Sequence, residues 1–390
     1  MQLTLKQEEG LRIAVDRYKH WEPYTCIGGF AGSGKTTLLR YIIEALGLDP
    51  EEDVAYITFT GKAATVLQHS GCPNAMTAHK FLFHAKPLPN GGFVFKPKVK
   101  LDQYPKVVVV DEISMLPKDL WELLLSHHIY VIACGDPFQL PPIYKDTDNH
   151  VLDKPHIFLD EIMRQAQESE IIRASMAIRN YNALDLFKGK EVQVLSIDEL
   201  STGMMLWADQ IITATNKTRT SINSMVRQAL NRGAAPEHGD KVICCRNSWE
   251  IVDDNLGNSL VNGTIGYLCD PTFSELNYPK AFKLPSVPLV DTHLVTDANE
   301  RFSNLRIDKK TIEENVKTLS PQQEFFASKK LGFAPLEFNY GYAITCHRAQ
   351  GSQWNKVLVI EESFPFAREE HARWLYTAIT RASDKLVLIR

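Results

Sequence analysis

Short apolar runs alternate with amphipathic segments through the first half of the chain, and this alternation predicts the secondary structure. Four of the runs contain few polar residues and do not alternate, which is typical of strands covered on both faces in a parallel sheet. They are residues 24–30, 54–60, 106–112 and 130–136. Helical patterns separate them, for example at 36–46 and 118–128. A strand–helix–strand repeat predicts a doubly wound α/β fold that binds ligands at the carboxyl ends of its strands.

Two segments interrupt this repeat and are predicted to be insertions. Residues 84–100 contain an Asn-Gly-Gly turn at 90–92 before a short alternating run, which is typical of a β-hairpin. Prolines cluster within 266–335, where the alternation of helices and strands stops, so we expect a small β-rich insertion there. Apolar strands at 355–362 and 384–390 then restore the parallel pattern. The predicted fold class is α/β, with two doubly wound cores and two β insertions.

Composition narrows the class of protein. The chain of 390 residues carries 43 Lys and Arg against 47 Asp and Glu, a net charge of −4. A uniformly basic surface for nucleic acid is therefore excluded, and a phosphate backbone would have to bind in a local groove. The seven cysteines include one adjacent pair, Cys244 and Cys245, and no CxxC spacing, which argues against a disulfide framework and a zinc site. With no apolar run of roughly 18 residues and no secretory signal, we expect a cytoplasmic protein without a membrane partner.

The most specific motif is a glycine-rich loop between the first strand and the helix that follows it. Residues 29–36 read GFAGSGKT, a complete GxxxxGK[ST] phosphate-binding sequence. Its glycines allow successive backbone N–H groups to point into one concavity, which the helix N-terminus makes more positive. The pattern predicts that Lys35 contacts the β- and γ-phosphates and that the Thr36 hydroxyl binds Mg²⁺. The predicted ATP-binding residues of this loop are Gly29, Gly32, Ser33, Gly34, Lys35, Thr36 and Thr37.

Two carboxylates and a glutamine complete the predicted chemistry. Asp111 and Glu112 directly follow a buried strand, where one carboxylate can hold Mg²⁺ and the next can deprotonate the attacking water. Gln139 follows the next strand, where it can donate a hydrogen bond to the γ-phosphate and lose it after hydrolysis. Joined to the glycine-rich loop, these residues indicate a nucleoside-triphosphate hydrolase with ATP and Mg²⁺ as its ligands.

Further blocks, in the same order along the chain, resemble the motifs of superfamily 1 helicases. The matching blocks are 58–64 (motif Ia), 77–80 (motif Ib), 342–352 (motif V) and 375–382 (motif VI). Within that superfamily the chain is similar to the 1B branch, which includes RecD-like and Dda-like helicases, over essentially its whole length. It departs from the family pattern at Phe59, where proline is usual, and at 347–350, where lysine followed by serine is more common.

The resemblance assigns roles to further residues. Gln7 is similar to the glutamine that reads adenine, and Gln350 and Gly351 of motif V are placed at the ATP site. Arg164 and Arg381 match arginines that would approach the γ-phosphate from opposite sides. Arginines in that role contribute roughly 10³–10⁵ in rate in related hydrolases. If Arg381 comes from the second core, hydrolysis requires the two cores to close on ATP.

DNA contacts are predicted along both cores and the hairpin. Small or polar donors in motifs Ia, Ib and V suit phosphate and sugar, and aromatic residues can stack on bases at roughly 1–3 kcal/mol per base. Phe81 and Phe83 equally suit core packing, and the alternating lysines within 96–100 suit either a solvated strand edge or a DNA path. By resemblance, Phe93 or Phe95 is the wedge of a strand-separating pin. The predicted DNA-binding residues are Thr60, Lys62, Thr77, His79, Phe81, Phe93, Phe95, Thr345 and His347.

The resemblance also implies the domain organisation and the function. The predicted domains are a RecA-like core at 1–83 and 101–183, a pin at 84–100, a second RecA-like core at 184–265 and 336–390, and an SH3-like insertion at 266–335. The implied activity is ATP-driven translocation of a monomer on single-stranded DNA, 5′ to 3′, with unwinding of forked duplex DNA. Candidate partners are replication or recombination proteins, and the compartment is the cytoplasm, that of the host if a bacteriophage encodes the chain. Two alternatives stay open: a DNA-stimulated ATPase that remodels protein–DNA complexes, and an ATP-switched DNA-binding subunit without processive unwinding.

Overall fold

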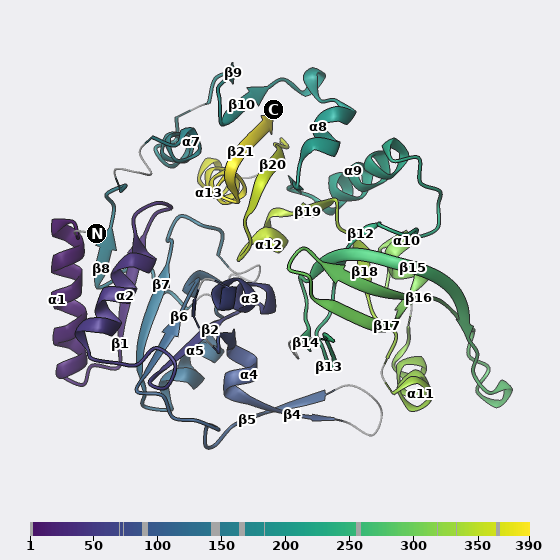
Figure 1. The fold of residues 1–390 in the computed structure, drawn as a ribbon, viewed down its shortest axis with the longest axis horizontal. Coiled ribbons are helices and arrows are strands. Elements are labelled where there is room, and N and C mark those ends of the chain that lie inside the picture. Colours follow the sequence, from purple (N-terminus) through teal and green to yellow (C-terminus); the bar gives the residue numbers. More distant parts are fainter. Residues whose placement is uncertain are drawn as a thin grey trace.

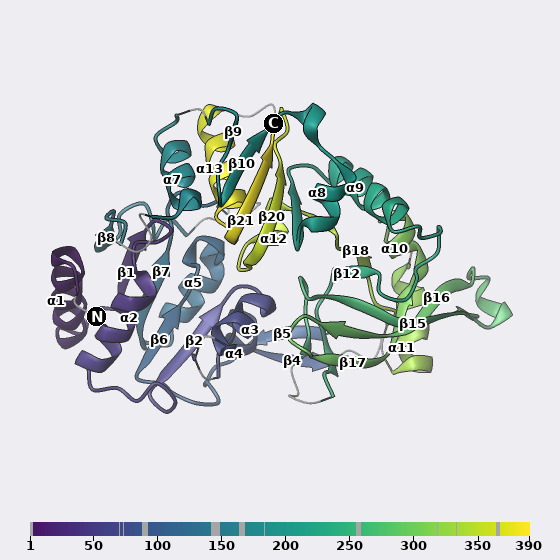
Figure 2. The same cartoon turned by 45° about the horizontal axis from the view of Figure 1, so that its top comes forward.

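The chain folds into two α/β cores, an antiparallel sheet and a separate hairpin (Figure 1). The structure is a computed structural model that describes residues 3–69, 71–72, 74–87, 93–141, 149–163, 168–182, 184–254, 259–317, 319–332, 334–363 and 367–390. The two cores lie side by side, and the antiparallel sheet lies next to both of them (Figures 1 and 2). Among the helices of these residues, none is both long and apolar enough to cross a membrane.

The first core is a six-stranded sheet in the order β3-β2-β6-β7-β1-β8, and all of its strand pairs are parallel. Its central strands are buried on both faces, as their continuous apolar runs predict. Separate hydrophobic clusters cover the two faces. The elements are α1 (Leu5–Lys19), β1 (Tyr24–Gly29), α2 (Lys35–Ala45), β2 (Val54–Thr58), α3 (Gly61–His69), β3 (Met76–Thr77), α4 (Ala78–Leu82), β6 (Val107–Val110), α5 (Lys118–Leu125), β7 (Tyr130–Gly135) and β8 (Ile157–Leu159).

The second core is a six-stranded sheet in the order β19-β11-β20-β21-β10-β9, parallel except for the edge strand β9. Helix α7 (Glu170–Arg179) packs against α13 and β21 of this core, although the sequence-based boundary placed it in the first core. The other elements are β9 (Phe187–Lys188), β10 (Val192–Leu195), α8 (Thr202–Trp207), β11 (Gln210–Thr213), α9 (Asn216–Ala229), β19 (Ala343–Thr345), α12 (Cys346–Ala349), β20 (Trp354–Ile360), α13 (Arg368–Ile379) and β21 (Ala382–Ile389).

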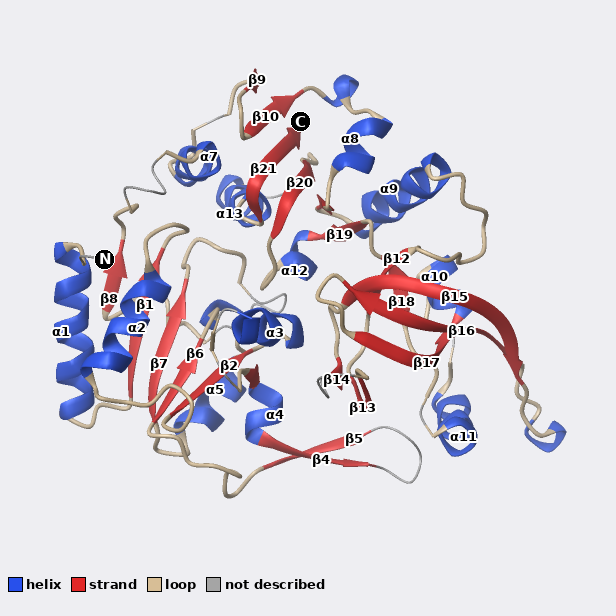
Figure 3. Cartoon of the chain, viewed as in Figure 1, coloured by secondary structure: helices blue, strands red, loops and turns tan. Residues whose placement is uncertain are grey.

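The antiparallel sheet has five strands in the order β17-β16-β15-β12-β18 (Figure 3). It takes in more of the chain than the predicted insertion 266–335, because β12 and β18 pair with each other from either side of that interval. Its elements are β12 (Lys241–Cys244), β15 (Ile265–Leu276), β16 (Val287–Thr296), β17 (Arg301–Asp308), α10 (Lys309–Glu314), α11 (Pro321–Leu331) and β18 (Phe338–Tyr340). A two-stranded sheet of β13 (Ser248–Val252) and β14 (Ser259–Leu260) lies beside it.

One tight contact joins this antiparallel unit to the first core. Gly61 begins α3, and a Cβ atom there would come within 2.1 Å of a Val261 methyl group. Val261 is itself buried, so its side chain packs directly against the backbone of Gly61 at this point.

Strands β4 (Phe83–Pro87) and β5 (Phe93–Pro97) form the antiparallel hairpin at the predicted position. Its turn, 88–92, lies outside the described residues. The alternating row of lysines does not continue past the strand. Lys98 is buried and donates hydrogen bonds to the carbonyl of Lys80 and the carboxylate of Asp102.

Candidate active site

A cavity of about 400 Å³, here called the inter-core cavity, lies at the carboxyl end of the first sheet. The first core lines it with the loops that follow β1, β6 and β7, and the second core with segments beside α12 and β21. Its lining residues include Lys35, Thr36, Asp111, Glu112, Gln139, Gly351 and Arg381. Residues from distant parts of the sequence, predicted to act on one triphosphate, therefore face the same space.

The glycine-rich loop lines part of the inter-core cavity. Gly34 has a left-handed backbone with φ of 80°, and α2 begins at the next residue. The ammonium of Lys35 donates hydrogen bonds to the carbonyls of Gly29 at 2.6 Å and Phe30 at 3.0 Å. Ser33 Oγ is buried and has no hydrogen-bond partner within the described residues. The loop therefore presents a cation and an unsatisfied hydroxyl, both suited to a phosphate.

Three other predicted residues of this loop occupy different places. Gly32 and Thr36 line the inter-core cavity, whereas Thr37 is half-buried in α2 and is not among the described lining residues. The role of Thr36 as a metal ligand stays a prediction.

Gln7 supports the glycine-rich loop from behind. Its side chain is 1% exposed and caps α1, where its Oε1 accepts a hydrogen bond from the Thr4 N–H at 3.0 Å. Its Nε2 donates to the carbonyls of Ser33 at 3.5 Å and Gly34 at 3.4 Å. Both ends of the amide are thus engaged, and the predicted contact with adenine would require it to turn away from the loop.

The two carboxylates at the end of β6 line the inter-core cavity, and Glu112 faces the second core. Glu112 has a left-handed backbone, φ 53° and ψ 49°, which is rare for a residue other than glycine and is often found at functional sites. One carboxylate oxygen lies 3.7 Å from a guanidinium nitrogen of Arg381. The other is buried with no hydrogen-bond partner in the described part of the chain.

Burial raises the pKa of both Asp111 and Glu112 above the ordinary carboxyl range. The charges of Arg381 and Lys35 oppose this rise at Glu112, and that of Lys35 opposes it at Asp111. A carboxylate with a raised pKa is a stronger proton acceptor, as a general base requires.

The second core holds Arg381 in place. The side chain is 4% exposed, and its guanidinium donates hydrogen bonds to the carbonyls of Thr377 at 3.1 Å and Ser352 at 3.3 Å. A third hydrogen bond reaches Thr380 Oγ1 at 3.3 Å. Since the end of the guanidinium still faces Glu112, a cation from one core meets a carboxylate of the other.

The two predicted glutamines lie in different places. Gln139 lines the inter-core cavity, as expected for a residue that senses the γ-phosphate. Gln350 was predicted at the ATP site, but it is 5% exposed and its Nε2 donates a hydrogen bond to the carbonyl of Leu140 at 2.8 Å. It therefore joins the second core to the loop after β7 and is not among the described residues that line the cavity.

Gly351 allows the two cores to come close together. A Cβ atom at this position would lie 2.9 Å from Ala63 Cβ and 3.2 Å from Glu112 Oε2. Its φ of 73° also favours glycine. A larger residue would hold the cores apart at the inter-core cavity.

Three predicted DNA-contacting threonines lie where strands end and helices begin. Thr60 precedes α3 and Thr77 precedes α4, and their hydroxyls accept hydrogen bonds from the N–H groups of Ala63 at 3.3 Å and Lys80 at 3.2 Å. Thr345 precedes α12 in the second core. The carboxyl ends of both parallel sheets therefore carry helix N-termini, although Thr77 and Thr345 are themselves buried.

Lys62 is enclosed between the cores. Its ammonium lies 4.5 Å from the ring centroid of Trp354 in the second core, a cation–π contact. Burial, followed by repulsion from Lys241, lowers its pKa from 10.5 to about 7, against the opposing effect of Asp297. In this arrangement the predicted DNA contact would require Lys62 to leave Trp354.

The low pKa of Lys62 predicts a pH-dependent stability. The unfolded chain binds this proton up to about pH 10.5 and the folded chain only to about pH 7, so stability should rise with pH between them. Lys62→Met should remove this contribution, making the rise in unfolding free energy from pH 7 to 9 smaller by on the order of 1 kcal/mol. Urea unfolding of wild type, Lys62→Met and the exposed control Lys118→Met measures it. Equal pH slopes for all three would contradict the enclosed ammonium.

The aromatic predictions divide between a partly buried cluster at the hairpin, in which Phe95 is exposed, and the core. The His79 ring stacks on Phe83 with centroids 5.7 Å apart, and Phe95 lies 6.1 Å from the same ring. Burial lowers the pKa of His79 and of His347, so both favour the neutral form. Phe81 was predicted to stack on a base, but it is buried in the hydrophobic cluster of the first core and offers no free face.

Two predictions lie outside what the structure describes, and several lining residues were missed. Arg164 and the side chain of Phe93 are outside the described residues.

The lining residues without a prediction include Ser352, Gln353, Thr380, Ile171 and Ile172. The neighbours of Gly351 and Arg381 could have been found from their place beside motifs V and VI. No sequence signal points to the two isoleucines, because α7 reaches the cavity only through tertiary packing.

Comparisons with known proteins agree with this division into two halves. Residues 5–193 match the family described as AAA domain, and residues 340–389 match the UvrD-like helicase C-terminal domain. The first match contains the glycine-rich loop and both carboxylates, and the second contains Arg381. The two matched segments thus meet at the inter-core cavity.

Named relatives specify the branch. The chain is 25% identical to the ATP-dependent RecD2 DNA helicase of Deinococcus radiodurans, over 92% of this chain and 45% of that protein. It is 25% identical to the ATP-dependent DNA helicase Dda of Enterobacteria phage T4, over 58% of this chain and 57% of that protein. The chain is similar to helicases of the 1B branch of superfamily 1. It spans about half of the length of these two 1B relatives.

Solved structures share the fold of this chain. The Bacteroides Pif1 helicase in complex with ADP-AlF3 and single-stranded DNA matches with a TM-score of 0.54 and 17% identity, over 100% of this chain and 92% of that one. The Pif1 helicase of Candida albicans matches with a TM-score of 0.51 and 18% identity, over 100% and 94% of the two chains. Both contain the mixed α/β architecture described above.

Proposed function

We propose that this chain is an ATP-dependent DNA helicase of superfamily 1B that hydrolyses ATP in the inter-core cavity. The observation that carries the proposal is the approach of Arg381 to Glu112 across the two cores at 3.7 Å. A site completed by both cores makes hydrolysis dependent on their closure, which is the property a motor needs. The proposal is also supported by the names of the RecD2 and Dda relatives.

The residues present fit a magnesium nucleotide. Lys35 and the backbone N–H groups of the glycine-rich loop would hold the β- and γ-phosphates. Thr36 and Asp111 would hold Mg²⁺, which when bound neutralises charge on the phosphates. Ser33 Oγ and one oxygen of Glu112, both buried without a partner in the described residues, leave hydrogen-bonding capacity that a hydrated nucleotide can satisfy.

In the proposed reaction the chain's residues act on a water molecule and on the γ-phosphate. Glu112 accepts the proton of the attacking water, and Gln139 binds the γ-phosphate before hydrolysis. Arg381 stabilises the charge that develops in the transition state, and we propose that Arg164 does so from the opposite side. Loss of the γ-phosphate removes the attraction for Arg381 and lets the cores separate.

We propose that single-stranded DNA runs across both cores, past the helix N-termini at Thr60, Thr77 and Thr345. The exposed ring of Phe95, which lies beside His79, supports a role for the hairpin as a pin, with Phe95 as the wedge that meets a forked duplex. The antiparallel sheet would then be the SH3-like domain, and movement would be 5′ to 3′, as in the resembled branch.

The test is ATPase activity with and without oligo(dT), followed by unwinding of duplexes with a 5′ or a 3′ overhang. We expect hydrolysis to be stimulated by oligo(dT) and only the 5′-tailed duplex to be unwound. Stimulation without strand separation would instead favour a remodelling ATPase. DNA binding that depends on ATP without stimulated hydrolysis would favour an ATP-switched subunit, and unwinding of the 3′-tailed duplex alone would reverse the polarity.

A further inference from the structure

The loop that follows β7, residues 136–140, is bonded mainly to the opposite core. The Leu140 N–H donates a hydrogen bond to Thr377 Oγ1 at 2.9 Å, and Arg373 donates to the Pro137 carbonyl at 3.1 Å. Both partners lie on α13, the helix that leads to Arg381. The β7 loop carries Gln139, so the predicted γ-phosphate sensor rests on the helix that supplies the arginine.

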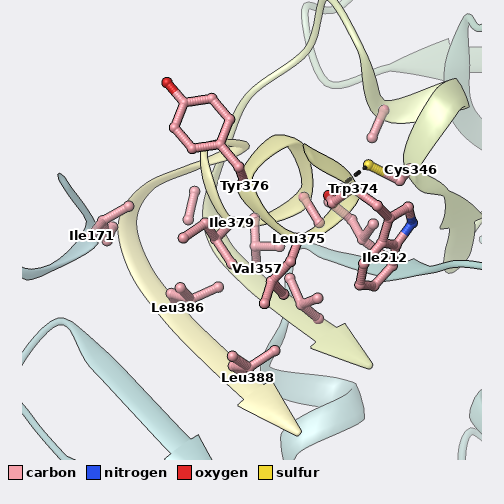
Figure 4. Packing of buried hydrophobic residues seen from close by; sticks show 14 of the residues in the cluster. Ile171, Ile212, Cys346, Val357, Trp374, Leu375, Tyr376, Ile379, Leu386 and Leu388 are labelled. Atoms are coloured by element: carbon pink, nitrogen blue, oxygen red, sulfur yellow. Dashed lines mark hydrogen bonds between the residues drawn. The ribbon is translucent and has the colours of Figure 1, made fainter. Parts of the chain in front are cut away.

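Tyr376 of α13 extends these contacts to the glycine-rich loop. Its hydroxyl donates a hydrogen bond to Asp136 Oδ2 at 2.6 Å and accepts one from the Ala31 N–H at 2.9 Å. The residue is 0% exposed. Figure 4 shows its hydroxyl directed away from the labelled side chains of the hydrophobic cluster in the second core. Burial, together with the charge of Asp136, raises the pKa of the phenol, so the hydroxyl keeps its proton and remains a donor.

The partners of this hydroxyl are both on the first core and both line the inter-core cavity. The two hydrogen bonds of Tyr376 can therefore exist only while the cores are closed. When the cores separate, water can satisfy Ala31 and Asp136 instead. The hydroxyl consequently favours the closed arrangement over the open one, and does so beside the site of hydrolysis.

We propose that Tyr376 is a positioning residue for ATP hydrolysis, which links the glycine-rich loop and the β7 loop to α13 when the cores close. This inference rests on the proposed ATPase function. Closure then positions Arg381, Gln139 and the glycine-rich loop together. The reason is that the Tyr376 hydroxyl, on the helix that ends beside Arg381, contacts both the glycine-rich loop and the β7 loop.

The alternative is that Tyr376 only fills space. Its ring packs edge-on against Phe138 with centroids 5.2 Å apart, and that contact needs no hydroxyl. Tyr376→Phe keeps the ring and removes only the hydrogen bonds. Tyr340→Phe is the matched control, because the Tyr340 hydroxyl is buried but has no hydrogen-bond partner within the described residues.

The experiment compares steady-state ATP hydrolysis of wild type, Tyr376→Phe and Tyr340→Phe at saturating oligo(dT). We expect Tyr376→Phe to lower kcat by on the order of tenfold, since a buried N–H and a buried carboxylate oxygen lose their partner only in the closed state. The KM for ATP should change by less than about twofold, because ATP binds mainly to the first core. Tyr340→Phe should match wild type.

Equal kcat values for the two phenylalanine variants would overturn the inference and leave the proposed function standing. A raised KM with unchanged kcat would also overturn it, since the hydroxyl would then act in binding and not in closure. Thermal unfolding shows whether Tyr376→Phe is folded. If it is not, Thr377→Val decides in its place. This variant removes the acceptor for the Leu140 N–H on the same loop and should lower kcat in the same way. Wild type that hydrolyses no ATP would instead refute the proposed function itself.

Discussion

Replacing Glu112 with glutamine is expected to lower kcat for ATP hydrolysis by roughly 10²–10⁴-fold while the affinity for ATP is retained. The substitution keeps the shape of the side chain, and the residues predicted to hold the phosphates lie on the glycine-rich loop. It removes the proton acceptor and the negative charge that faces Arg381 at 3.7 Å. Steady-state hydrolysis with oligo(dT), together with equilibrium binding of ATP, measures the two effects separately.

The pKa of Glu112 adds a second expectation for the wild-type enzyme. The base must be deprotonated to act, so kcat/KM for ATP rises with pH through the pKa of this carboxyl in the free enzyme. Because burial raises that pKa, the acid limb of the profile should lie above the ordinary range of glutamic acid. Glu122→Gln, an exposed substitution on α5, is the control and should leave both kcat and the pH profile unchanged. Wild-type turnover by Glu112→Gln would mean that another group activates the water.

Replacing Arg381 with alanine is expected to lower kcat by roughly 10³–10⁵-fold, as for other arginines that stabilise phosphoryl transfer. The guanidinium belongs to the second core and reaches the cavity only when the cores are together, so ATP binding to the first core should be nearly unaffected. DNA binding without ATP should also remain. Hydrolysis, ATP affinity and oligo(dT) affinity, measured on the same preparation, distinguish loss of chemistry from loss of binding.

Arg368→Ala is the matched control for Arg381→Ala, because it removes an exposed arginine from the first turn of the same helix, α13. It should hydrolyse ATP at the wild-type rate. If Arg381→Ala also kept that rate, the second core would not contribute to the reaction. The motor mechanism proposed here would then have to be abandoned.

The positions of the cavity residues in the first core could be predicted because they lie in short contiguous motifs. The glycine-rich loop depends on backbone conformations that its own glycines permit, and Asp111 and Glu112 follow a strand that is recognisable from four consecutive valines. Arg381 also lines the inter-core cavity, and only the resemblance of its motif pointed to a place at this site.

Features that depend on tertiary packing could not be predicted in the same way. The amphipathic pattern of α7 indicates a helix, but nothing in it says which of two similar sheets the helix covers. Gln350 has the same donors whether it faces a nucleotide or the Leu140 carbonyl, and the fold decides between them. Phe81 likewise suits a base or the core equally well until its neighbours are known.

The contact between Gly61 and Val261 has a consequence for any separation of the cores. The antiparallel sheet is tied to the second core, where Lys241 donates a hydrogen bond to Gln210 at 3.1 Å, and it touches the first core where Val261 meets the start of α3. If the cores separate as proposed, both attachments cannot persist. We expect the van der Waals contact against Gly61 to break before the hydrogen bond, so that the sheet moves with the C-terminal half and shifts relative to the hairpin.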